Sequence, residues 1–162
     1  MMRINRRTDY AVRVILALAK QPACTRMSSQ MIQEQMCIPR PFLNRIIAEL
    51  SRGGLIVTYP GPSGGLELAR AAGAINLRQI WEAVEGPLLI SDCLAAPGEC
   101  PLSGGCPVRC RWSRLQNLML AELESITAQE LAEDAVKMMA LKAPVRAKVK
   151  AKKIIPQFSE VH

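Results

Sequence analysis

The chain has 162 residues, of which 49% are hydrophobic, and a formal net charge of +7 at pH 7. This length fits one domain, or one domain with an extension, and the apolar content suffices for a core. No apolar run reaches the roughly 18 residues that a membrane-spanning helix needs, and the charged N-terminus lacks the apolar segment of a secretory signal. We therefore expect a cytoplasmic protein, in a compartment where disulfides are rare.

Positive charge is concentrated at the two ends of the chain. Residues 1–70 hold ten Arg and Lys against four Asp and Glu, residues 71–141 hold five against nine, and residues 142–162 hold six against one. The local net charges are thus +6, −4 and +5. The basic first region favours binding to a polyanion, although solubility alone would also explain it. Because the chain has two Tyr and two Phe, an aromatic platform for single-stranded nucleic acid is not expected.

The first predicted helix spans residues 8–20. Its apolar face, at helical spacing, comprises Ala11, Val14, Ile15 and Leu18. Thr8 is the expected N-cap, which puts Asp9 in the first turn. A carboxylate there stabilises the positive end of the helix dipole, so the local pattern alone gives Asp9 a structural role.

Two short helices joined by a tight turn are predicted next. Ser28 or Ser29 can cap the first, which ends near Met36, and the second has Pro41 in its first turn and ends at residues 53–54. The apolar face of the second helix comprises Leu43, Ile46, Ile47 and Leu50. This arrangement is typical of a helix-turn-helix. The candidate DNA-binding residues of the pair are Ser28, Ser29, Arg40, Pro41, Asn44, Arg45 and Arg52. Arg and Asn can read base edges, but an ordinary solvated helix face is the alternative.

A β-hairpin is predicted directly after the helix pair. Residues 55–59 and 66–68 have strand-like sequences, and the turn between them is rich in Pro and Gly. A hairpin in this position makes the fold a winged helix, although a plain surface hairpin is the alternative. Ser63, Gly64 and Gly65 would form a wing tip that can approach a phosphate or a minor groove closely.

Three further helices are predicted. Residues 75–86 carry a capping box of Asn76 and Gln79, and residues 111–125 form a long helix. A second capping box, of Thr127 and Glu130, starts a helix that ends near residue 141. The apolar stripe of the long helix is wider than one contact needs, so we expect it to pair with a second chain. Residues 142–162 are expected to be a disordered basic tail, which would add nonspecific DNA affinity or only solubility.

Four of the six cysteines lie close together, at Cys93, Cys100, Cys106 and Cys110, among Pro and Gly residues. Several thiolates in such a loop, which we expect to be neither helix nor strand, are what an iron–sulfur cluster requires. A tetrahedral zinc site without a sensing role is the alternative, although only Cys106 and Cys110 have the short spacing of zinc sites. An electron carrier or thiol oxidoreductase fits least, because no Cys-x-x-Cys occurs.

The remaining cysteines and the single histidine limit other functions. Cys24 and Cys37 are expected in the core, because free cysteine is among the most buried residue types. The single histidine, His162, lies at the C-terminus. A Ser/His/Asp or Cys/His catalytic arrangement is therefore excluded, and we expect a protein that is not an enzyme.

Several motifs together resemble one known family. They are TDYAVR, IPRPFLNRIIAELSRGGLI, GPSGGLELAR, the WEAVEG helix end, the three cysteines Cys93, Cys100 and Cys106 with Trp112 six residues after the last of them, and SITAQEL. Over about residues 2–135 the chain resembles the iron–sulfur winged-helix repressors that include IscR and NsrR. The resemblance implies a mainly α fold with a small β wing. It also implies a homodimer built on the long helix, which reads a palindromic operator in double-stranded DNA.

The resemblance also implies a cluster, 2Fe–2S or 4Fe–4S, held by Cys93, Cys100, Cys106 and one further ligand. IscR uses a histidine three residues after its last cysteine, where this chain has Arg109, which cannot be a ligand. The nitric-oxide-sensing branch is similar to this chain around Asp9, where the aspartate can bind the cluster. The resemblance thus makes Asp9 the leading candidate for the fourth ligand and Cys110 its competitor. The signal implied is nitric oxide, redox state or iron–sulfur status.

These predictions divide the chain into four parts. Residues 1–86 form the winged helix-turn-helix domain, and residues 87–110 form a cluster-binding loop, which we call the cysteine segment. Residues 111–141 are the dimerisation helices, and residues 142–162 are the basic tail.

Overall fold

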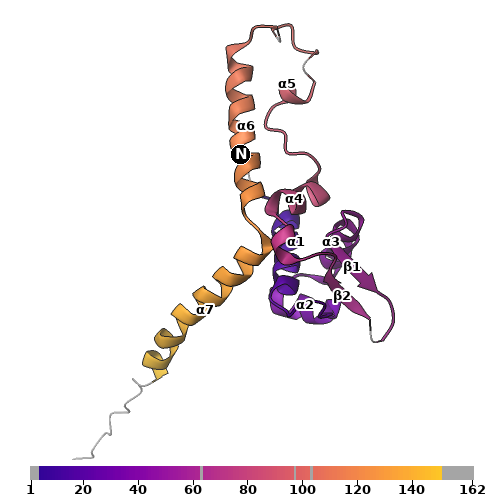
Figure 1. The fold of residues 1–162 in the computed structure, drawn as a ribbon, viewed down its shortest axis with the longest axis vertical. Coiled ribbons are helices and arrows are strands. Elements are labelled where there is room, and N and C mark those ends of the chain that lie inside the picture. Colours follow the sequence, from indigo (N-terminus) through magenta and orange to yellow (C-terminus); the bar gives the residue numbers. More distant parts are fainter. Residues whose placement is uncertain (1–3, 63, 97, 103, 151–162) are drawn as a thin grey trace, which may run out of the picture.

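The computed structural model describes residues 4–62, 64–96, 98–102 and 104–150. In chain order the elements are α1 (Arg6–Ala19), α2 (Ser29–Met36), α3 (Arg40–Arg52), β1 (Ile56–Tyr59), β2 (Gly65–Leu68), the 3₁₀ turn η1 (Ala72–Ala74), α4 (Leu77–Glu85), α5 (Asp92–Ala95), α6 (Pro107–Ser125) and α7 (Ala128–Lys150). Helices α1 to α4 and the two strands form one body, from which α6 and α7 project in different directions (Figure 1). The predicted fold class, mainly α with a small β wing, is confirmed.

The core of the body lies between α1, α3 and α4. All four apolar residues predicted for the first helix are buried in it, together with Leu43, Ile46 and Leu50 of α3. Ile47 is half-buried at the edge of the core. Since α3 buries one face against α1, its opposite face remains exposed to solvent.

The first helix begins earlier than its sequence pattern predicts. Asn5 is the N-cap, and its side chain accepts hydrogen bonds from the backbone N–H groups of Arg7 at 2.8 Å and Thr8 at 3.1 Å. Asn is at least as good an N-cap as Thr, so the earlier residue takes this role. Thr8 instead lies buried inside the first turn. The prediction of Thr8 as the cap was therefore wrong.

The helix-turn-helix signals are confirmed in detail. Ser28 caps α2, because its hydroxyl accepts a hydrogen bond from the N–H of Met31 at 3.1 Å. Pro39 precedes α3, Pro41 lies in its first turn, and Gly53 is its C-cap. These local signals fix the angle at which α3 leaves the turn.

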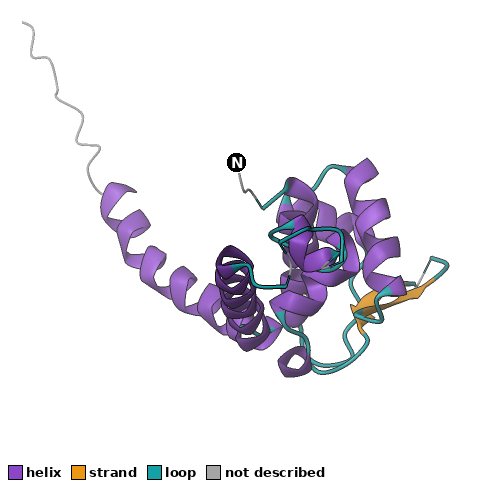
Figure 2. Ribbon diagram, turned by 90° about the horizontal axis from the view of Figure 1, so that it is seen from above, coloured by secondary structure: helices purple, strands orange, loops and turns teal. Residues whose placement is uncertain are grey.

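The wing is an antiparallel pair in which Ile56 faces Leu68 and Tyr59 faces Gly65. Met27, just before α2, extends the pairing, because it exchanges two backbone hydrogen bonds of 2.9 and 2.8 Å with Leu66. At Gly65 an added Cβ would lie 2.8 Å from the carbonyl oxygen of Met27. The close approach therefore requires glycine and joins the wing to the helix-turn-helix. In Figure 2 the strands lie at the opposite side of the body from α7.

Two capping boxes, both predicted, start α4 and α7. Asn76 and Gln79 bond each other's backbone N–H groups at 3.0 and 3.2 Å, and Thr127 and Glu130 do so at 3.2 and 2.8 Å. The two helix starts also pair with each other through backbone hydrogen bonds. This pairing holds the junction of α6 and α7 against the body.

The C-terminal half differs from the prediction in three places. One helical turn, α5, interrupts the cysteine segment, and α6 begins at Pro107 rather than near residue 111. Proline is favoured in the first turn of a helix, which explains the earlier start. Helix α7 continues to Lys150, so its predicted end near residue 141 was wrong. Ala, Lys and Arg are good helix formers even without an apolar stripe. The rest of the predicted tail lies outside the described residues.

Within the described part of the chain, no helix is both long and apolar enough to cross a membrane.

Candidate DNA-binding face and cysteine segment

The exposed face of α3 carries the residues predicted to read DNA. Arg40, Asn44, Arg45 and Arg52 are all exposed, as is Pro41 in the first turn. They are exposed because α1 covers the opposite, apolar face of the same helix. The helix thus presents three guanidinium groups and one amide to solvent.

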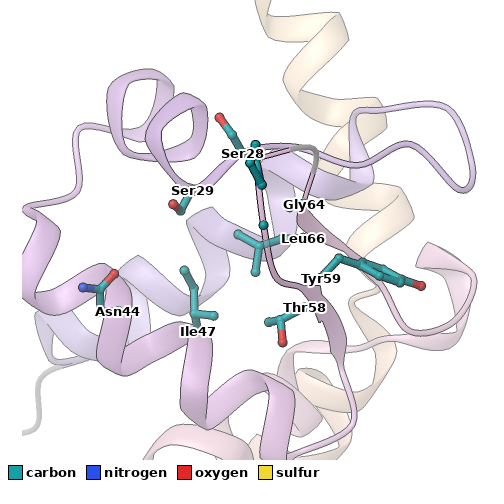
Figure 3. A pocket seen from close by; sticks show the side chains of 11 residues that line it. Ser28, Ser29, Asn44, Ile47, Thr58, Tyr59, Gly64 and Leu66 are labelled. Carbon is teal, nitrogen blue, oxygen red and sulfur yellow. The ribbon is translucent and has the colours of Figure 1, made fainter.

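An open hollow of about 450 Å³ lies between α2, α3 and the wing. Figure 3 shows Ser28 and Ser29 on one side of it, Asn44 on α3, and Thr58 and Tyr59 on the wing. Its lining includes five of the predicted DNA-binding residues, namely Ser28, Ser29, Asn44, Gly64 and Gly65. The remaining predicted residues, Arg40, Pro41, Arg45 and Arg52, belong to α3 but not to this lining, and Ser63 lies outside the described residues.

A clamp between the wing and the segment before α2 was not predicted. The guanidinium carbon of Arg26 lies 3.6 Å from the centre of the Tyr59 ring, and its Nε lies 3.6 Å from Oε2 of Glu67. The Tyr59 hydroxyl donates a hydrogen bond of 2.6 Å to Oε1 of Glu67. This bond is the main reason why the pKa of Tyr59 is raised. The three side chains together fix the wing to the segment that precedes α2.

A buried carboxylate on α3 was also missed. Glu49 is 5% exposed and is bound by Arg7 of α1 through two hydrogen bonds, of 2.6 and 3.0 Å. Arg45 adds a third hydrogen bond of 3.1 Å. Burial by itself raises the pKa of Glu49, but the bonds from Arg7 and then Arg45 outweigh this effect and lower the pKa. Glu49 is therefore a carboxylate at neutral pH, held inside the body by two arginines.

The cysteine segment runs beside the upper half of α6 (Figure 1). Cys93, Cys100 and Cys106 are half-buried and Cys110 is exposed, and all are free thiols. Cys106 is the N-cap of α6, and it lines a second hollow of about 540 Å³ together with Cys110 and Arg109. In the part of the chain that the structure describes, no three His, Cys, Asp or Glu side chains lie close enough together to hold a metal ion.

Asp9 lies in the first turn of α1, in the body. Its carboxylate forms an ion pair of 2.7 Å with Arg13, one turn later on the same helix. The predicted ligands therefore fit an iron–sulfur cluster by their chemistry and accessibility. A single chain in this conformation does not bring them together.

Cys24 and Cys37 are both exposed, so the prediction that they lie in the core was wrong. Each has a left-handed backbone conformation, with φ of 61° and 51°. Cys37 is the C-cap of α2, and Cys24 lies in the loop after α1. The backbone turns at Cys24 and Cys37 therefore keep their side chains at the surface, despite the apolar character of the thiol.

Comparison with known proteins identifies the family. Residues 4–134 match the Rrf2 family, described as "Iron-dependent Transcriptional regulator". The chain belongs to the Rrf2 family. Among its relatives, the regulator NsrR of Geobacillus kaustophilus is 29% identical over 141 residues, which cover 86% of this chain and 96% of the relative. The chain is therefore a DNA-binding transcriptional regulator and not an enzyme.

Two solved structures support the Rrf2 fold. IscR of T. potens superimposes with a TM-score of 0.66 at 24% identity, over 83% of this chain and 88% of that one. CymR, described as the global cysteine regulator of B. subtilis, superimposes with a TM-score of 0.65 at 22% identity, over 82% and 98%. At these identities the likeness establishes the winged-helix fold alone.

Large apolar side chains are exposed on both projecting helices of this Rrf2 protein. On α6 they are Val108, Trp112, Leu115 and Leu118, and on α7 they are Val136, Met138, Met139 and Leu141. Exposure of so many large apolar groups on two neighbouring helices is typical of an interaction surface.

Proposed function

We propose that this Rrf2 regulator is a homodimeric repressor that reads a palindromic operator with α3 and the wing. The observation that carries this proposal is the hollow between α2, α3 and the wing, which gathers small hydroxyl residues, Asn44 and three glycines beside an arginine-rich helix face. Serine hydroxyls and glycine backbone can approach phosphates, while Asn and Arg recognise bases. The exposed apolar groups on α6 and α7 support a second copy as the partner.

The proposal extends to an iron–sulfur cluster that sets operator affinity. Cys93, Cys100 and Cys106 would hold it as thiolates, and Asp9 would be the fourth ligand, supplied by the second chain of the dimer. Such a cluster supplies iron that reacts with nitric oxide or oxygen. Among the described residues of one chain, no three His, Cys, Asp or Glu side chains lie close enough together to hold a metal ion, which supports a site shared between two chains.

Asp9 is available for this role. Its present partner is Arg13, and their side chains are 46% and 43% exposed. Exposed ion pairs at this spacing contribute only a few tenths of a kcal/mol, so the carboxylate can exchange its partner at little cost. Since a carboxylate is a harder ligand than a thiolate, it would hold iron less tightly than the three cysteines do.

A zinc-stabilised regulator without a sensing cluster is the second candidate. It is favoured by Cys106 and Cys110, because these two cysteines are four residues apart in the sequence and line the same hollow. Purification without oxygen, followed by absorption and Mössbauer spectra and by iron, sulfide and zinc counts, separates the two. Brown protein with matching iron and sulfide supports the cluster. Colourless protein with about one zinc per chain would overturn it.

A further inference from the structure

The face of α3 that packs on α1 carries one charged residue, Glu49, among the apolar residues Leu43, Ile46 and Leu50. An ionised carboxylate in such a place is very unfavourable unless cations bind it. The cation that neutralises it comes from α1. Nη2 of Arg7 lies 2.6 Å from Oε1, and Nε lies 3.0 Å from Oε2, so the guanidinium binds both carboxylate oxygens. Bidentate pairs of this kind are the strongest that side chains form.

Arg45 reaches the same carboxylate from the DNA-binding face. Its Nε donates a hydrogen bond of 3.1 Å to Oε1, the oxygen that already accepts from Arg7. The Arg45 side chain is nevertheless 69% exposed. A guanidinium has five N–H donors, so one bond to Glu49 leaves most of them available for DNA.

We propose that Arg7 is a positioning residue for DNA binding, which keeps Arg45 available by neutralising Glu49. The proposal rests on the role of α3 as the recognition helix, proposed above. With Arg7 present, the carboxylate is satisfied and Arg45 contributes its positive charge to the DNA face. Without Arg7, Glu49 keeps a buried negative charge for which Arg45 is the cation already in contact. Arg45 is then drawn back along the helix, and its charge is cancelled.

The test compares four full-length proteins prepared without oxygen at one salt concentration. They are the parent, Arg7→Ala, Arg45→Ala and the double variant. The probe is a duplex enriched from a random-sequence library with the parent protein. Arg45→Ala is expected to weaken binding about ten- to hundredfold, the effect of one lost base contact. Arg7→Ala is expected to weaken it about tenfold in the parent, but by less than about twofold in the Arg45→Ala background.

Arg6→Ala is the matched control, because it removes the same charge from the same turn of α1, at a residue that is exposed. It is expected to change affinity by about twofold or less, which would exclude a long-range charge effect. A second variant guards against misfolding. Arg7→Met combined with Glu49→Met replaces the pair by apolar side chains, which buried sites tolerate. Because this variant has no carboxylate to capture Arg45, its affinity is expected to lie within about threefold of the parent.

The outcomes are distinguishable. If Arg45→Ala binds the duplex as tightly as the parent, Arg45 does not contact DNA and the inference about Arg7 is overturned as well. A tenfold loss from Arg7→Ala that is equal in both backgrounds would overturn the positioning role alone. A double-methionine variant that folds but binds as weakly as Arg7→Ala would also overturn it.

Discussion

The hydroxyl of Thr8 donates a hydrogen bond of 2.8 Å to Oε1 of Glu85 and so joins the first turn of α1 to the last residue of α4. The same oxygen accepts a second hydrogen bond, also of 2.8 Å, from the side chain of Asn5, the N-cap of α1. One carboxylate thus connects the start of the first helix to the point where the chain leaves the body for the cysteine segment.

Replacing Thr8 by Val should therefore destabilise the fold. The change keeps the shape of the side chain but removes a buried donor, and the expected loss is about 1–2 kcal/mol of unfolding free energy. Denaturant unfolding measures it. Thr8→Ser retains the hydroxyl and should lose clearly less. Equal losses in the two variants would show that the methyl group, not the hydrogen bond, matters at this position.

Stability should depend on the ionisation of Glu49 in acid. Its pKa in the folded protein lies below its ordinary value of 4.5. Such a group contributes stability that is fully present above pH 4.5 and is lost as pH falls through the lower, folded pKa. Glu49→Gln should be less stable than the parent at pH 7 by about 1–3 kcal/mol. That difference should shrink below pH 4.5, as measured by denaturant unfolding between pH 7 and pH 3. A constant difference over this range would contradict the prediction.

Loosening the wing clamp should weaken DNA binding without unfolding the protein. Arg26→Ala removes the contact with the Tyr59 ring and the ion pair with Glu67. The expected loss of affinity is about two- to fivefold, from a contact of ~0.5–1 kcal/mol. Lys20→Ala, which removes an exposed charge outside the clamp, is the control. Equal losses in both variants would indicate that charge alone is responsible.

Removing a residue that contacts DNA directly should weaken binding more than loosening the wing clamp. Arg40→Ala and Asn44→Ala are each expected to lose about 1–3 kcal/mol of binding free energy and to relax specificity at one base pair. Selection from a random-sequence library with each variant shows which base pair becomes permissive. If both variants select the parental sequence with parental affinity, α3 is not the recognition helix.

The fourth ligand can be decided by two variants. Asp9→Ala should keep three thiolates but give a labile cluster and a blunted response to nitric oxide, whereas Cys110→Ala should leave the cluster largely unchanged. Absorption spectra and operator affinity, before and after a nitric oxide donor, measure both effects. If Asp9→Ala has the spectrum and operator affinity of the parent while Cys110→Ala loses the cluster, the ligands are four cysteines.

The elements of the body could be predicted from the sequence because their signals are local. Ser28, the pair Asn76 and Gln79, and the glycines after α3 each act within a few residues, and all lie where expected. Asn5 was overlooked as a cap because Thr8, nearer to the apolar face, offered the same chemistry. A cap prediction therefore identifies the helix but not its first residue.

The parts that could not be predicted depend on distant partners or on backbone reversal. Glu49 lies at helical spacing from Leu43, Ile46 and Leu50, and a charge on an apolar face signals a buried partner. That partner, Arg7, is 42 residues away, and no local pattern names it. The exposure of Cys24 and Cys37 follows from left-handed backbone, which their sequence neighbours do not require. The cysteine segment has no periodicity from which the arrangement of its thiols could be derived.

The Arg7–Glu49 pair limits how freely recognition can be transferred between regulators. An engineer who moves only residues 40–52 into another winged-helix scaffold also moves a buried negative charge without the arginine that neutralises it. Such a chimaera should lose stability, and it should recover when an arginine is added at the equivalent place on the first helix. With α3 as the proposed recognition helix, the modular unit of sequence recognition in this protein would be α3 together with one residue of α1.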